Sequence, residues 1–440
     1  MVGITKMKAE KQKAEKEAFF CTTKELSRLG LEQIPTQFQS HKHLIYSSPA
    51  TLAFNSPGAE GFGVKRAGLA VPDSIMLIVA PGCCGRNTSL ISSMKEYNDR
   101  FYYLMMDETD IVTGRHLKKI PKAVEEICSV CPKKPSVVMI CITCVDALLG
   151  TDMERVCKKA EEQVEIPVRP CYMYALTREG RKPPMVHVRQ SLYSLLEPGK
   201  KKGNVVNLLG FFSPLVGDCE IYDLLHSAGV KTIHEISRCK DYMEYQTMSE
   251  ANFNLVLHHE ARFAAEDFHN RLQIPFIELR RLYQIDKIEN QYHALGNALG
   301  VAFYDEKYKK QAEDALEKFR QKCPDASFAI GECLNADPFE LSLALIRYGF
   351  SVPEIYGTIT VENFTYIRSL AKISPETKVF SNMEPTMIYY DPAKSDVNLA
   401  IGKDACYYHP DCPYVMWNGE EQPYGYAGVR RLFEQLLEVV

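Results

Sequence analysis

The sequence lacks long apolar runs, low-complexity tracts and a large excess of either charge. With no run of 18 or more apolar residues, a membrane-spanning helix is excluded. The chain carries 52 basic and 56 acidic residues and a net charge of −4, so we expect no nucleic acid partner. Residues 1–16 are rich in Lys, Glu and Ala and lack the apolar core of a signal peptide. Together these absences predict a cytoplasmic protein without a membrane partner.

Cysteine, by contrast, is plentiful, with 15 residues in the chain. Without an export signal, this number argues against a disulfide framework and indicates a reducing environment. Most of these thiols are expected to pack as small apolar side chains. Clusters at the ends of strands are the exception, because thiolates there can bind metal.

Two predicted strands end in such clusters. Residues 75–80 are an apolar run typical of a buried parallel strand, and Pro81-Gly82 leads from it into Cys83 and Cys84. The strand predicted over 136–142 brings in Cys141 and Cys144. In open α/β sheets, ligands bind outside the carboxyl ends of strands. The pattern therefore predicts a metal or iron–sulfur site at one sheet edge.

Strands and helices alternate through the rest of the chain, which predicts an α/β protein with three doubly wound parallel-sheet (Rossmann-like) domains around a central cleft. We expect an N-terminal helical arm over 1–47 and a first domain with the cysteines over 48–200. A linker of Gly and Lys near 198–203 would lead to a second domain over 201–324. The third domain would occupy 325–440 and end in a helix.

Four segments, in order, resemble the component 1 (molybdenum–iron-type) proteins of nitrogenase and their relatives. These relatives include subunits of dark-operative protochlorophyllide reductase and the reductive cyclase of nickel-tetrapyrrole synthesis. V-A-P-G-C-C-G at 79–85 resembles the family's H-G-P-x-x-C, and D-E-T-D-I-V-T-G at 107–114 resembles E-x-D-I-V-x-G. T-C-V-D-A-L-L-G-T-D at 143–152 is similar to T-C-x-x-x-x-I-G-D-D, and P-Y-G-Y-A-G at 423–428 to P-Y-x-G-x-x-G.

The resemblance implies an oxidoreductase subunit that carries an iron–sulfur cluster, 4Fe-4S or larger, near a subunit boundary. It also implies a homodimer, or a heterodimer with a related subunit, and electrons delivered by a separate ATP-dependent iron protein. The chain has no G-x-x-x-x-G-K-[ST] loop, so ATP would belong to that partner. Cys84 and Cys144 are the first candidates for cluster ligands, followed by Cys83 and Cys141.

Departures from the family pattern restrict the chemistry. Another cluster cysteine is expected before the first strand, where this chain has A-F-N-S at 53–56. His258-His259 stand where nitrogenase has a cofactor-binding cysteine, and Val415–Trp417 where it has a cofactor histidine. We therefore expect no iron–molybdenum cofactor. His258 and His259 become candidates for a proton donor, a cofactor ligand or satisfied core residues.

Several other patterns have plainer explanations. The C-x-x-C of Cys128 and Cys131 is expected to cap and pack a helix end. The closely spaced Cys406, His409 and Cys412 would leave a zinc site one ligand short. Glu108 and Asp110 are expected to cap a helix or to hydrogen-bond near the cluster. Lys65 and Arg66 are expected to be a solvated charge pair, with contact to an acidic reductase as the alternative.

Three functions fit these observations. The first is a nitrogenase-like reductase, in which the cluster passes electrons to a substrate near His258 and His259. The second is a scaffold that holds a maturing metallocluster and hands it on, and the third is a sensor or binding protein on the same fold.

Overall fold

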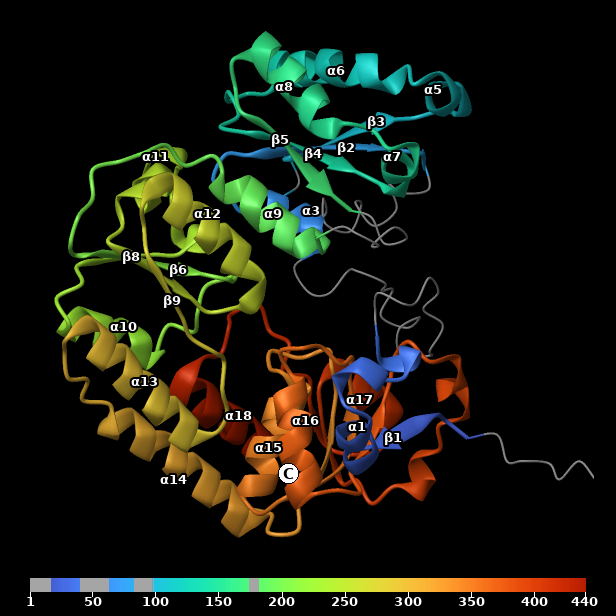
Figure 1. The fold of residues 1–440 in the computed structure, drawn as a ribbon, viewed down its shortest axis with the longest axis vertical. Coiled ribbons are helices and arrows are strands. Elements are labelled where there is room, and N and C mark those ends of the chain that lie inside the picture. The colour runs from blue at the N-terminus through green and yellow to red at the C-terminus, as the bar shows by residue number, and fades with distance from the viewer. Residues whose placement is uncertain (1–16, 40–62, 83–96, 98, 174–181) are drawn as a thin grey trace, which may run out of the picture.

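Three sheets, parallel apart from one edge strand and each flanked by helices, form the three lobes of the molecule (Figure 1). The computed structural model describes residues 17–39, 63–82, 97, 99–173 and 182–440. Cys83, Cys84 and most of the helix expected over 88–97 lie outside the described residues. The predicted class, α/β with doubly wound parallel sheets, is confirmed. Within the described part of the chain, none of the helices combines the length and apolar character needed to cross a membrane.

The first sheet has the strand order β3-β2-β4-β5. Every residue of β2 is buried, because helices cover both faces of the sheet. Helices α6 and α8 pack on one face, and α3 and α9 on the other (Figure 1). The elements are α3 (Gly63–Gly68), β2 (Ile75–Ala80), β3 (Phe101–Met105), α5 (Glu108–Thr113), α6 (His116–Val130), β4 (Val138–Ile142), α7 (Cys144–Leu149), α8 (Met153–Val164), β5 (Val168–Tyr172) and α9 (Pro184–Tyr193).

The second sheet has the order β7-β6-β8-β9, again with the first strand in the middle. Helix α9 packs against α12, so one apolar core continues from the first sheet into the second. The elements are β6 (Val205–Leu209), α10 (Glu220–Ser227), β7 (Thr232–His234), α11 (Tyr242–Gln246), β8 (Phe253–Val256), α12 (Arg262–Leu272), β9 (Phe276–Glu278), α13 (Ile285–Leu299) and α14 (Glu306–Lys322).

The third sheet has the order β1-β12-β11-β10-β13-β14. Its edge strand β1 comes from the N-terminal segment and pairs antiparallel with β12, with Phe20 opposite Phe380. The segment expected to be a helical arm thus contributes a strand as well as a helix. The elements are β1 (Phe20–Thr22), α1 (Thr23–Leu29), β10 (Ser327–Ile330), α15 (Pro338–Arg347), β11 (Ser351–Tyr356), α16 (Phe364–Ile373), β12 (Lys378–Phe380), β13 (Leu399–Ile401), α17 (Lys403–Tyr408), β14 (Tyr414–Val415) and α18 (Gly425–Val439).

Candidate functional site

The two cysteine-bearing strand ends are neighbours in the first sheet. Strand β2 pairs in parallel with β4, and Val79 lies opposite Ile142. Strand β3 is added on one side of β2 and β4 on the other, so the strand order changes direction at β2 while all four strands stay parallel. In doubly wound sheets this switch point is where ligands bind. The expectation that both strand ends meet at one edge is confirmed.

Only part of the predicted cluster site can be placed. Cys83 and Cys84 follow Gly82 outside the described residues, and Cys144 is the first residue of α7, where only its backbone is described. Beside it, Thr143 is buried, and its hydroxyl has no hydrogen-bond partner among the described residues. Among the described side chains, no three from His, Cys, Asp and Glu come together in a way that would hold a metal ion.

Cys141 faces the apolar core instead of the sheet edge. Its side chain is completely buried in the middle of β4, within the cluster that joins the sheet to α3 and α9. Across the strands it lies opposite Cys171, whose thiol has a pKa raised well above its usual value by burial. This environment favours a packing role for Cys141, and its role as a ligand stays a prediction.

Helix α7, which begins at Cys144, is held by a buried histidine that the sequence analysis did not single out. His116 Nε2 lies 2.9 Å from Asp146 Oδ1, and its Nδ1 lies 3.0 Å from the carbonyl oxygen of Asp110. The hydroxyl of Thr151 also donates to Asp146 Oδ1 (3.1 Å). The other carboxylate oxygen of Asp146 is buried without a partner in the described structure.

Asp110 anchors this network from the adjacent helix. Asp107 and Asp110 form a capping box at the start of α5, which confirms the capping role expected for Asp110. Hydrogen bonds from Lys119 (2.6 Å) and Arg115 (2.8 Å) hold the pKa of Asp110 well below its usual range. Glu108 lies exposed in the first turn of the same helix.

His258 and His259 follow β8 at the switch point of the second sheet, between β6 and β8. The two rings stack with centroids 4.5 Å apart, and Phe211 meets the His258 ring edge-on at 5.7 Å. Gly210 has φ 138°, and a Cβ added there would lie 2.8 Å from the backbone nitrogen of His258. Glycine therefore permits the close approach of the two strand ends.

The electrostatic surroundings keep His258 neutral. Burial of the ring, together with the charges of Arg189 and Arg281, lowers the pKa of His258 well below its usual value, although 33% of the side chain is exposed. The backbone N–H of Glu260 donates to its Nδ1 (3.4 Å). A neutral imidazole of this kind is a poor proton donor near pH 7 and a competent metal ligand. His259 is exposed.

Two arginines that the sequence analysis missed frame this strand end. Arg189 of α9 donates from Nε to the carbonyl oxygen of Gly210 (3.0 Å) and from Nη1 to Glu260 (2.8 Å). Arg281 lies 4.4 Å from the Phe211 ring centroid. The sequence could have identified Arg281, because this residue follows β9 at the sheet edge where parallel strands end and ligands bind.

A loop after β14 ties the three lobes together at this point. Gln422 accepts a hydrogen bond from Arg281 (2.6 Å), and Glu420 pairs with Arg66 of α3 (2.7 Å). Arg66 is 9% exposed and Lys65 6% exposed, so the prediction of a solvated charge pair is wrong. Lys65 and Arg66 are buried because α3 packs under the loop that follows β14, near the far end of the chain.

His409, in the third lobe, belongs to a different hydrogen-bond network. His409 is buried, with Nε2 lying 3.1 Å from Glu354 Oε2 and 2.8 Å from the hydroxyl of Tyr390. Burial opposes ionisation, but hydrogen bonds from His409 and Tyr390 lower the pKa of Glu354. Burial also raises the pKa of Cys406 to about 12. These contacts give His409 and Cys406 structural partners and speak against a zinc loop with Cys412.

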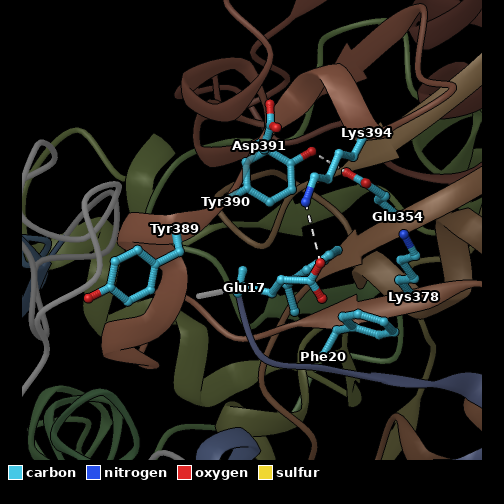
Figure 2. A pocket seen from close by; sticks show the side chains of 10 residues that line it. Glu17, Phe20, Glu354, Lys378, Tyr389, Tyr390, Asp391 and Lys394 are labelled. Carbon is cyan, nitrogen blue, oxygen red and sulfur yellow. Dashed lines mark hydrogen bonds and ion pairs between the residues drawn. The ribbon is translucent and has the colours of Figure 1, made fainter. Parts of the chain in front are cut away.

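A small hollow of about 80 Å³ opens above that network (Figure 2). Carboxylates and cations both line it: Lys394 contacts Glu17 (3.3 Å), and the ammonium of Lys378 lies 5.1 Å from the Phe20 ring centroid. At the end of α6, Cys131 Sγ lies 3.0 Å from the hydroxyl of Tyr102, a packing contact of the kind expected for Cys128 and Cys131.

Comparison with known proteins gives consistent matches over most of the chain. A family model described as "Nitrogenase component 1 type Oxidoreductase" matches residues 60–440. A protein of Sinorhizobium fredii named "Nitrogenase iron-molybdenum cofactor biosynthesis protein NifE" is 25% identical over 418 residues, 89% of this chain and 82% of that protein. The protein of the same name from Clostridium pasteurianum is 25% identical over 56% of this chain and 54% of its own length.

Solved structures show the same fold. A structure titled "Nitrogenase Cp1 at pH 6.5" superposes with a TM-score of 0.69 at 18% identity, covering 90% of this chain and 92% of the other. A second, "Nitrogenase Cp1 at pH 5", gives a TM-score of 0.62 at 16% identity and covers 93% of this chain and 96% of the other. At these identities the likeness extends to the fold alone.

Proposed function

Because the chain belongs to the nitrogenase component 1-type oxidoreductase family, we propose that it is a scaffold that holds a metal–sulfur cluster during assembly and passes it on. The observation that carries this proposal is the match to NifE proteins, which are named for cofactor biosynthesis, across 89% of the chain. This puts the scaffold, the second of the three functions considered from sequence, ahead of the reductase.

The cargo would bind at the switch point of the first sheet. Cys84 and Cys144 follow β2 and β4, and Cys83 is available beside them. Thiolates are the ligands that iron–sulfur clusters prefer. The buried hydroxyl of Thr143 and the free oxygen of Asp146 fit a polar surrounding in which a bound group completes the contacts.

An edge with two or three thiols suits a shared cluster. Clusters of the 4Fe-4S type commonly take four thiolate ligands. The cysteine expected before β2 is replaced by the A-F-N-S of residues 53–56. We therefore expect a second chain, either another copy or a related subunit, to supply the remaining ligands, and an ATP-dependent iron protein to supply electrons.

The site at the end of β8 supports a role in holding a cluster rather than in catalytic reduction. A neutral His258 is a poor acid toward a substrate at pH 7. Its single lone pair is on Nδ1, so a metal bound there would displace the contact from Glu260. The backbone contact from Glu260 fixes the ring, and Arg189 fixes the loop on which both residues stand. Phe211 and His259 cover two sides of the ring. In this proposal, His258 and His259 are positioned to hold cargo.

The test is a cluster-transfer experiment on anaerobically purified full-length protein. Iron and sulfide are counted in the wild type and in C84A, C144A and C157A, the last being a matched control because Cys157 is buried in α8. We expect C84A and C144A to lose most of the iron and C157A to keep it. The loaded wild type should then transfer iron to an apo-acceptor protein. Equal iron in all four proteins would overturn the ligand assignment.

A reductase remains the second candidate, favoured by the description of the family as oxidoreductases. The two functions differ in one measurement. With an iron protein and ATP supplied, a reductase consumes reducing equivalents in many turnovers, whereas a scaffold stops after its cluster is reduced. Multiple turnovers that survive in H258A/H259A would exclude both the scaffold function and a catalytic role for these histidines.

A further inference from the structure

A hollow lined by four cationic side chains lies between α1 and α16 in the third lobe, away from the cysteine and histidine sites. It has a volume of about 380 Å³, and its lining residues are Lys24, Ser27, Arg28, Arg368, Ala371 and Lys372. None of the lining residues is acidic or aromatic.

The spacing of these residues explains how the hollow forms. In each helix the lining residues stand at positions i, i+3 and i+4: Lys24, Ser27 and Arg28 in α1, then Arg368, Ala371 and Lys372 in α16. This spacing puts each set on one helix face. The small i+3 residue, Ser27 or Ala371, leaves the space that the flanking cations surround.

The two helices are held in this position by the chain itself. The backbone N–H groups of Thr23 and Lys24 donate to the carbonyl oxygens of Thr377 and Pro375, just after α16. Beneath the hollow, Leu26 packs with Ile367 in the apolar core. The cationic faces are therefore fixed toward each other by packing and backbone hydrogen bonds.

None of the four cations forms an ion pair within the described structure, although the charge of Arg28 acts on the Glu25 carboxylate in the same helix. The guanidinium of Arg368 lies 5.0 Å from the Phe364 ring centroid and forms no ion pair among the described residues. The carboxylate near Arg28 is that of Glu25, which accepts from the backbone N–H (2.8 Å) and hydroxyl (3.0 Å) of Thr22 to cap α1. The pocket above Glu354 differs, because carboxylates line it as well as cations.

One of the cations stands where helix electrostatics disfavour it. Cations are favourable near helix C-termini, which accounts for Arg28 and Lys372. Lys24, however, is the second residue of α1, where the positive end of the helix dipole repels an ammonium. Lys24 nevertheless lines the hollow.

From this arrangement we propose that the hollow binds a small anion with two or more phosphate groups. Arginine forks bind phosphate oxygens bidentately and lysine adds point charge, so four cations match a polyphosphate better than a single anion. No aromatic residue lines the hollow, so no aromatic ring there would stack on a nucleobase. The ligand is therefore recognised by its phosphates, from free pyrophosphate or from a nucleotide tail.

The test is isothermal titration of the full-length protein in 0.15 M NaCl with pyrophosphate, triphosphate and ADP. We expect R28Q/R368Q to bind pyrophosphate at least tenfold more weakly than the wild type. The control K158Q/K159Q, which removes two exposed charges on α8, should stay within twofold. Binding of pyrophosphate at least as tight as that of ADP shows recognition through the phosphates and supports the proposal. Tighter binding of ADP would show that the nucleoside contributes and would overturn recognition by phosphates alone.

A single variant separates binding from folding. K24Q removes an unfavourable charge at the start of α1, so it should unfold at the same or a higher temperature while binding pyrophosphate more weakly. The proposal is overturned if pyrophosphate produces no heat at millimolar concentration, or if the control weakens binding as much as R28Q/R368Q. Tighter binding of hexaglutamate than of triphosphate would also overturn it and identify the surface as a docking site for an acidic protein segment.

Discussion

His116 Nε2 lies 2.9 Å from Asp146 Oδ1 with both side chains buried, and this pair joins α6 to the helix that begins at Cys144. Both ring nitrogens of His116 lie within hydrogen-bond distance of oxygen atoms, one of Asp146 and one of Asp110. The pair therefore helps to position α7.

Replacing His116 should show how much its contact with Asp146 contributes to stability. We expect H116A to lower the free energy of unfolding by about 2–4 kcal/mol, because the Asp146 carboxylate would stay buried without its partner. Urea denaturation measures the change. H293A is the control, since His293 is exposed and its loss should change stability by less than ~0.5 kcal/mol. Equal stability of the two variants would show that α7 is held by other contacts.

Gly210 should resist substitution for a steric reason. In G210A, the new Cβ would meet the His258 backbone at 2.8 Å, and the residue would adopt φ 138°. We expect a loss of about 2 kcal/mol or more in unfolding free energy, in line with backbone strain plus a clash that cannot relax. G203A is the comparison, because a Cβ there meets nothing within 4 Å. An unchanged urea midpoint for G210A would contradict this account of the strand-end geometry.

Asp110 should make the first lobe sensitive to acid. Its folded pKa is lowered by Lys119 and Arg115 below the ordinary value of 3.8, so its stabilisation is complete above that value and is lost as the pH falls through the folded pKa. The urea midpoint of the wild type should therefore fall more steeply than that of D110N from about pH 5 to pH 3. D314N, at an exposed position, should follow the wild type. If the urea midpoints of all three proteins fell in parallel with pH, Asp110 would not be the cause of the acid sensitivity.

The charge of Arg281 should be one of the factors that set the pKa of His258. Its charge is one of the causes that lower the pKa of His258, so R281Q should raise that pKa. Ring-proton chemical shifts followed by NMR against pH measure the change, with H258A used to assign the signal. The neighbouring variant R280Q removes an exposed charge and should leave the His258 titration in place. A larger shift in R280Q than in R281Q would contradict the electrostatic model.

Local patterns in the sequence predicted the strands that carry the site. The apolar run at 75–80 and the strand ending near Ile142 appear as β2 and β4, and their shared edge followed from parallel-sheet rules. Helices at strand ends were harder to predict. Helix α7 begins two residues after β4 ends, so a six-residue helix has no room for a periodic pattern.

Long-range contacts account for what the sequence could not predict. Helix α16 begins at Phe364 after the β-branched segment T-I-T-V, and its helical state depends on packing against α1 and α15. Burial of Arg66 depends on Glu420, and the position of His116 depends on Asp146. Each of these contacts joins residues far apart in the chain, so no local pattern predicts it.

The pairing of β1 with β12 joins two segments that are synthesised at widely separated times. Phe20 leaves the ribosome early, but its partner Phe380 is added near the end of translation. At typical elongation rates that interval lasts roughly 20 to 70 s. During this time the edge of the third sheet does not yet exist, and the nascent N-terminal strand has no native partner. The third lobe therefore closes last, and a chaperone bound to the emerging N-terminal segment would shield it until then.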